Sequence, residues 1–239
     1  MKPILVILLI SLTFTAAVGQ RKAEDKEPKC TLGLDHAPEL RGFRLATTQQ
    51  NVLARFPGVS IEKPDKFGLA RLRLKVIDSV GLIKGPVTRD KGVQADISAR
   101  PEDGSAFLLE STKFPPLKGV RRVELRFIDG RLSFVSIAYD DSIKWDNIDD
   151  FVSTVAKTLS LPAEWQNPAE AGGEGTEKEL RCDAFTISAN VGADPLDSRV
   201  GAQLTVEDLA AWKALSKRQN DLTEKAKREA DDKRKGFKP

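Results

Sequence analysis

The sequence predicts an α+β fold, in which an antiparallel β-sheet packs against two to three helices, with a cleaved signal helix before it and a charged C-terminal helix after it. Three observations predict this class. Residues 120–139 have the pattern of a β-hairpin, residues 148–159 carry an apolar stripe at helical spacing, and residues 69–77 alternate between apolar and basic side chains. With 239 residues, the chain is long enough to bury a sizeable core.

The first 19 residues are typical of a secretory signal peptide. Lys2 precedes the apolar run ILVILLI, and the small residues Ala17 and Gly19 stand where a cut before Gln20 requires them. The apolar run is short for a membrane span, which needs about 20 residues. We therefore expect export to the periplasm or the extracellular space, with a retained N-terminal anchor as the alternative. Residues 20–29 would be a flexible arm.

The two cysteines, Cys30 and Cys182, predict a disulfide, because an exported chain folds in an oxidising compartment. The alternatives are a metal site and a catalytic thiol. A metal site needs three or four ligands and a thiol nucleophile usually needs a histidine base, whereas the chain has one histidine, His36. We expect no metal and no other cofactor.

The elements follow in order from residue 40. Residues 40–46 alternate in the manner of a short strand. Thr48 offers an N-cap hydroxyl to a helix with one apolar face, and Pro57-Gly58 would end that helix. The strand 69–77 places Arg71, Arg73 and Lys75 on one wet, basic face.

Residues 78–119 are interrupted by glycine and proline, so only short strands at 93–98 and 106–110 are expected there. The hairpin 120–139 turns at Asp129-Gly130, the dipeptide of a type I′ turn. Its apolar pattern changes face between Phe134 and Val135, which predicts a bulge or burial on both faces.

The helix from residue 148 would be capped by Asp146, with Asp149 in its first turn, and ended by Pro162. A surface loop is expected at 167–179, followed by strands at 180–191 and 199–206. The α+β globular domain would span residues 30–206.

Residues 207–239 predict a charged C-terminal helix or tail, begun by a capping box of Thr205 and Asp208. Four acid–base pairs stand at i, i+4, which favours a solvated helix: Asp221–Lys225, Glu224–Arg228, Glu229–Lys233 and Asp231–Lys235. The alternative is weak contact of this basic tail with anionic surfaces. Because the chain is expected to be exported and its basic excess is local to this tail, we expect no nucleic-acid partner.

Two features could carry chemistry. The stretch YDDSIKWDNIDD, residues 139–150, contains five aspartates, but helix capping explains Asp146 and Asp149, and the spacing of a calcium loop is missing. His36 follows Asp35, yet no nucleophile elbow, phosphate-binding loop or dinucleotide-binding glycine pattern accompanies it. The sequence therefore favours a protein that is not an enzyme and has no catalytic residues.

The stretch RLATTQQNVLARFPG, residues 44–58, resembles the helix-start pattern of small outer-membrane assembly lipoproteins of the BamE (SmpA/OmlA) type, and the β-lactamase inhibitory protein domain is similar. Ala46 and Thr47 stand where that pattern has Gly and Met, and the lipid-bearing Cys is missing. The resemblance implies a compact α/β module that binds proteins. Over residues 41–48, 150–152, 161–165 and Cys182, the chain also resembles uncharacterised exported bacterial proteins, which implies no activity.

We consider three functions. The first is a non-enzymatic module of the cell envelope that binds another envelope protein, with Arg71, Arg73 and Lys75 as the candidate surface. The second is a binder of a lipid or cell-wall ligand, which an apolar cavity beneath residues 78–119 would favour and a solid core would oppose. The third is a hydrolase, which requires His36 and an aspartate of 140–150 to meet in one cleft.

Overall fold

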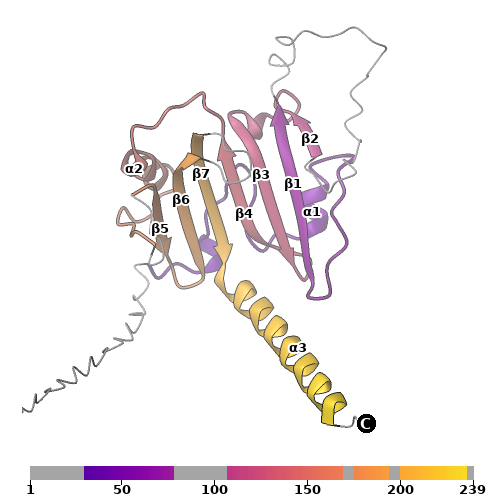
Figure 1. The fold of residues 1–239 in the computed structure, drawn as a ribbon. Helices are drawn as coiled ribbons and strands as arrows, with labels where there is room; N and C mark the ends of the chain where they lie inside the picture. Colours follow the sequence, from indigo (N-terminus) through magenta and orange to yellow (C-terminus); the bar gives the residue numbers. More distant parts are fainter. Residues whose placement is uncertain (1–29, 78–106, 169–174, 194–199, 236–239) are drawn as a thin grey trace, which may run out of the picture.

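The computed structural model describes residues 30–77, 107–168, 175–193 and 200–235. The expected signal peptide, the arm 20–29 and the expected strand 93–98 lie outside the described residues. A seven-stranded sheet is the centre of the fold, in the order β2-β1-β3-β4-β7-β6-β5 (Figure 1). Its strands are β1 Leu69–Ile77, β2 Phe107–Glu110, β3 Val120–Ile128, β4 Arg131–Tyr139, β5 Glu177–Arg181, β6 Phe185–Ala193 and β7 Val200–Asp208. The helices are α1 Gln49–Leu53, α2 Ile148–Thr158 and α3 Leu209–Lys235, with 3₁₀ turns at Leu34–His36 and Pro115–Leu117.

The α+β class is confirmed, but the sheet is mixed rather than antiparallel. Strand β2 runs parallel to β1, with Leu74 opposite Phe107, and all other neighbours are antiparallel. A parallel pair needs a connection of about a dozen residues or more. The interval between Ile77 and Phe107 is long enough for one, although its length alone did not reveal the direction of β2.

The hairpin of β3 and β4 is confirmed. Asp129 and Gly130 have φ of 51° and 74°, the two positive angles that a type I′ turn requires. The pairing shifts by one residue between Arg126 and Phe127, so that Ser133 of β4 is the extra residue of a bulge. Residues 132–138 of β4 are all buried, which confirms burial on both faces.

Residues 40–46 do not form the predicted strand. Leu40 and Phe43 exchange two backbone hydrogen bonds of 2.9 Å around Arg41 and Gly42, whose φ values are 53° and 89°. The chain therefore reverses in a tight turn, and the alternating burial of Phe43 and Leu45 arises from a bent segment rather than an extended one.

The first helix begins as predicted and ends earlier than predicted. The Thr48 hydroxyl accepts a hydrogen bond of 3.3 Å from the Asn51 N–H, so Thr48 is the N-cap of α1. Just before it, the Ala46 N–H donates to the Leu132 carbonyl at 2.8 Å, which ties this segment to the hairpin. The helix ends at Leu53, before Pro57.

Two helix caps differ from the predicted ones. Asn147, not Asp146, caps α2: its side chain accepts the Asp150 N–H at 2.9 Å, because Ile148 is already buried and begins the helix. The helix ends at Thr158, before Pro162. Thr205 lies within β7, and Asp208 caps α3 by accepting the Ala211 N–H at 2.9 Å, so the predicted capping box does not form.

The predicted strand 180–191 is in fact a hairpin. Strand β5 ends at Arg181 and β6 starts at Phe185, and the two pair antiparallel with Leu180 opposite Ile187. Strand β5 also takes in residues 177–179, which were expected to be loop. The turn at residues 182–184 holds Asp183 but no glycine or proline, so the sequence gives only a weak signal for it. Strand β6 pairs antiparallel with β7.

The two faces of the sheet differ. One face is apolar, with side chains such as Leu74, Leu125, Ile137, Ile187 and Leu204 at most 1 % exposed, and α2 packs on it over β5 and β6. The other face carries polar and charged side chains. Among the described residues, only the first turns of α3 pack on that second face, where the Trp212 ring meets the edge of Phe134 at 6.4 Å.

Helix α3 then extends away from the sheet (Figure 1). Every residue from Asn220 to Lys235 is exposed. The ion pairs within the helix join Asp231 to Arg234 and Asp232 to Lys235, three residues apart, and not at the four predicted i, i+4 positions. Neighbours at i+3 are about as close as those at i+4. None of the described helices is both long enough and apolar enough to cross a membrane.

Candidate functional site

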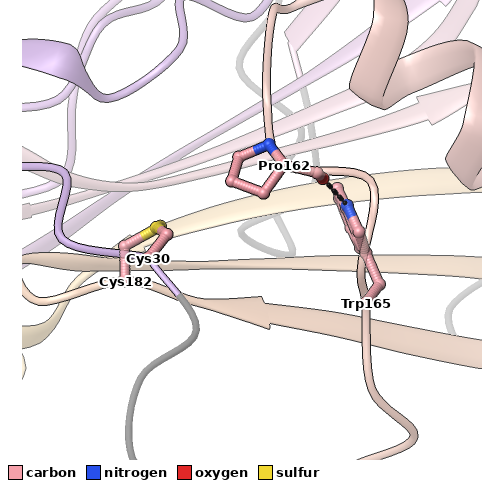
Figure 2. The surroundings of a disulfide bond; sticks show 4 residues. All are labelled: Cys30, Pro162, Trp165 and Cys182. Atoms are coloured by element: carbon pink, nitrogen blue, oxygen red, sulfur yellow. Dashed lines mark hydrogen bonds between the residues drawn. A yellow bond between two sulfur atoms is a disulfide. The ribbon is translucent and has the colours of Figure 1, made fainter.

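The disulfide between Cys30 and Cys182 is present, as predicted, with the two Cα atoms 4.5 Å apart. It ties the start of the described chain to the turn between β5 and β6, where the Asp183 N–H also donates to the Cys30 carbonyl at 3.1 Å. Pro162 and Trp165 lie nearby, joined by a 3.0 Å hydrogen bond from the Trp165 indole to the Pro162 carbonyl (Figure 2). Both sulfurs belong to buried residues, so this is a structural bond and leaves no thiol for chemistry among the described cysteines.

A large hollow opens on the apolar face of the sheet, beside α2. It has a volume of about 990 Å³. Its walls come from α2, the loop 140–145, the segment 111–119 and the turn at residues 39–41, and Leu204 of β7 also lines it. We call it the apolar hollow, because its surface is mainly aliphatic and aromatic: Leu40, Pro115, Tyr139, Ile143, Trp145, Phe151, Val155, Leu159 and Leu204.

Three aromatic rings form one side of the apolar hollow. Phe151 of α2 lies 6.1 Å from the Tyr139 ring and 4.9 Å from the Trp145 ring, measured between centroids. Aromatic rings at these separations attract one another beyond the burial of their area. The cluster holds the end of β4, the following loop and α2 in a fixed arrangement around the hollow.

Charged groups stand at the mouth of the apolar hollow. The Arg41 guanidinium lies over the Tyr139 ring at 5.4 Å, where a cation is attracted by the ring face. Burial raises the pKa of the Tyr139 hydroxyl, although the charge of Arg41 acts in the opposite direction. Lys118 is a second cation of the lining, and Glu39 is an acid of the lining. The turn at residues 40–43 is what brings Arg41 to this position.

The predicted acidic cluster is dispersed rather than gathered. The Asp140 carboxylate accepts hydrogen bonds from the backbone N–H and hydroxyl of Ser142, and Asp149 pairs with Lys178 of β5 at 3.3 Å. Within the described part of the chain, no three acidic, histidine or cysteine side chains gather in a way that could hold a metal ion.

His36 lies at the surface and contacts Asp35, with 3.0 Å between Nδ1 and Oδ1. This hydrogen bond lowers the pKa of the Asp35 carboxyl. Asp140 lines the apolar hollow and a smaller hollow of about 570 Å³ on the other side of the loop, and His36 lines neither. The meeting of His36 with an aspartate of 140–150 that a hydrolase requires is not found in either hollow.

The predicted basic surface lies on the opposite face of the sheet. Arg71 and Lys75 are exposed and Arg73 is partly buried, all on the polar side of β1. Strand β3 adds two more cations to this surface, because Arg122 lies opposite Lys75 and Arg126 lies opposite Arg71. Arg122 and Arg126 were not predicted as part of this surface, although both alternate with the apolar residues Val123 and Leu125 in the sequence.

The apolar hollow was not predicted from the sequence. Trp145 and Ile143 gave a signal that could have been used, since both are large apolar residues within a loop of otherwise polar character. Ile143 is 61 % exposed, and both residues line the two hollows. Arg41 gave no signal, because its position depends on the backbone of a turn that the sequence did not indicate.

No family model, curated protein or solved structure matches this chain. The resemblance of residues 44–58 to the BamE type therefore stays a prediction. Ala46, which stands where that pattern has glycine, adopts φ of 64°, in the left-handed region that glycine favours.

Proposed function

We propose that this protein binds an amphiphilic molecule and holds its hydrocarbon chain in the apolar hollow. The observation that carries the proposal is the hollow itself, whose volume of about 990 Å³ lies at the upper end of the range typical of ligand sites, about 300–1,000 Å³. The hollow is lined by residues 111–119, and an apolar cavity at this place favours a protein that binds a lipid or similar ligand over a protein-binding module with a solid core.

The lining favours an amphiphile over a wholly apolar or a wholly polar ligand. The aromatic and aliphatic surface around Phe151 would shield a chain from water. Arg41 and Lys118 are exposed at the mouth and form no ion pair within the described part of the chain, while the acids of the lining are Glu39 and Asp140. The two cations suit an anionic head group at the entrance.

We further propose that the protein acts outside the cytoplasm, in the periplasm or the extracellular space, after export directed by residues 1–19. The support is the Cys30–Cys182 disulfide, a bond that persists in oxidising compartments. A binding role is favoured over a catalytic one because His36 lines neither hollow.

The test is a chain-length series of fatty acids, with binding followed by calorimetry. Each added methylene that enters an apolar site contributes about 0.8 kcal/mol, so affinity should rise about 15-fold for every two carbons until the hollow is full. Affinity that does not depend on chain length, or no binding by any member of the series, would reject the proposal.

Two variants of α2 locate the site. Thr154 is exposed and lines the apolar hollow, so Thr154→Trp should partly fill the hollow and weaken binding of long chains at least about tenfold. Its neighbour Ser153 is equally exposed but lines a separate hollow of about 390 Å³. The matched control Ser153→Trp should leave affinity unchanged, and equal losses in both variants would place the ligand elsewhere.

A further inference from the structure

The polar face of the sheet carries a line of cations that is independent of the apolar hollow. We define the basic strip as Arg71, Arg73 and Lys75 of β1 with Arg122 and Arg126 of β3. The three side chains of β1 make no ion pair or hydrogen bond with any described residue, and no helix of the described chain covers β1 on this face.

The pairing across β1 and β3 places like charges directly opposite one another. Arg71 faces Arg126, and Lys75 faces Arg122. Like charges at directly opposite positions of an antiparallel pair destabilise the sheet. Strand positions on an exposed face tolerate many residues, so nothing in the packing of β1 requires cations there.

The acid directly opposite Arg73 does not neutralise it. Glu124 lies opposite Arg73, but its carboxylate pairs with Arg126 and accepts a hydrogen bond of 2.9 Å from the Arg126 Nε. The Arg73 Nε is buried and has no hydrogen-bond partner. The three cations of β1 thus keep a positive charge that no described residue pairs with.

We propose that the basic strip binds an extended acidic segment of a partner protein. Arg71, Arg73 and Lys75 stand on alternate residues of one strand, so neighbouring cations are about 6.7 Å apart. An extended segment with an acid at every second residue presents carboxylates at the same interval on one side. Leu108 of β2 lies beside Lys75 on this face and is 48 % exposed, which offers such a segment an apolar contact.

The test uses two synthetic eight-residue peptides of equal composition, one alternating Glu and Thr and one with its four Glu in a block, together with vesicles rich in phosphatidylglycerol. The alternating peptide should bind more tightly than the block peptide, and its affinity should fall as salt is raised. Equal affinity for the two peptides would overturn the proposed spacing. Binding to vesicles but to neither peptide would mean that the strip meets a lipid surface instead.

The variant Arg71→Gln/Arg73→Gln/Lys75→Gln removes the strip. Each exposed ion pair is worth a factor of about two to five, so the loss of three should weaken peptide binding about 10- to 100-fold. The melting temperature should not fall, because two like-charge oppositions are removed. The matched control Lys225→Gln/Lys227→Gln/Arg228→Gln changes three exposed cations of α3 and should bind as the unmodified chain does. Equal losses of affinity in both variants would show that only the net charge of the protein matters, and would reject the proposal.

The outcome of the peptide test is separate from that of the fatty-acid test, since the two sites lie on opposite faces of the sheet.

Discussion

Removal of the disulfide is the perturbation whose effect follows most directly from the structure. Cys30 and Cys182 are separated by 152 positions in the sequence, and both are buried, at 6 % and 1 % exposed. The double variant Cys30→Ala/Cys182→Ala leaves two small apolar side chains in their place. The change therefore removes a covalent link while creating little new cavity.

The expected magnitude comes from the unfolded chain. A cross-link that closes a loop of about 150 residues lowers the entropy of the unfolded state by an amount worth about 5 kcal/mol at room temperature. A typical domain is stable by about 5–15 kcal/mol. We therefore expect the variant to lose about 3–5 kcal/mol, since measured effects tend to fall below the chain-entropy value, and to lie near the limit of folding.

The assay is equilibrium unfolding in urea, followed by the fluorescence of Trp165 and Trp145. Trp165 lies near the disulfide, and Trp145 contacts Phe151 on the far side of α2. The midpoint should fall in the variant, and the unmodified protein in reductant should unfold at the same midpoint as the variant. A loss below about 1 kcal/mol, with both proteins folded, would refute the reasoning that the link acts by restricting the unfolded chain.

Two further predictions concern single side chains. The Asn147→Ala variant should lower the free energy of unfolding by about 1 kcal/mol, because the Asn147 side chain accepts the Asp150 N–H at 2.9 Å and caps α2. The control Asp146→Ala should change the free energy of unfolding by much less. Equal effects of the two substitutions would mean that Asn147 is not the cap. Burial raises the pKa of Glu207, so the folded state binds its proton more tightly than the unfolded state does; this contribution to stability is present below the unfolded pKa, near 4.5, and is lost as the pH rises through the raised value. The Glu207→Gln variant should therefore be more stable than the unmodified chain at pH 7, and should show no such gain below pH 4.5. Thermal unfolding measured across this pH range tests the prediction. A gain in stability that is the same at all pH values would contradict the burial of an ionised carboxylate.

The correct parts of the sequence analysis share a local cause. The Asp129-Gly130 turn, the Thr48 cap and the strand 69–77 depend on residues within a few positions of each other, and each is present in the structure. The disulfide needed only a count of cysteines and the chemistry of an oxidising compartment.

Two of the errors have a different cause, which is that the deciding partner lies outside the stretch concerned. The parallel direction of β2 depends on β1, from which it is separated by residues 78–106. The turn at residues 182–184 holds no glycine or proline, and its ends are joined by the pairing of Leu180 with Ile187.

The site divides in the same way. The sequence by itself determined the basic alternation of Arg71, Arg73 and Lys75, because side chains on a strand alternate between faces whatever the fold around them. Only the tertiary structure decided that Arg122 and Arg126 would stand opposite Lys75 and Arg71, since strand register is set by the β1–β3 pairing. The apolar hollow also depends on the tertiary structure alone. It is the space left between α2, the turn that carries Arg41 and the segment 111–119, and no single stretch of sequence encodes the space between three separate segments.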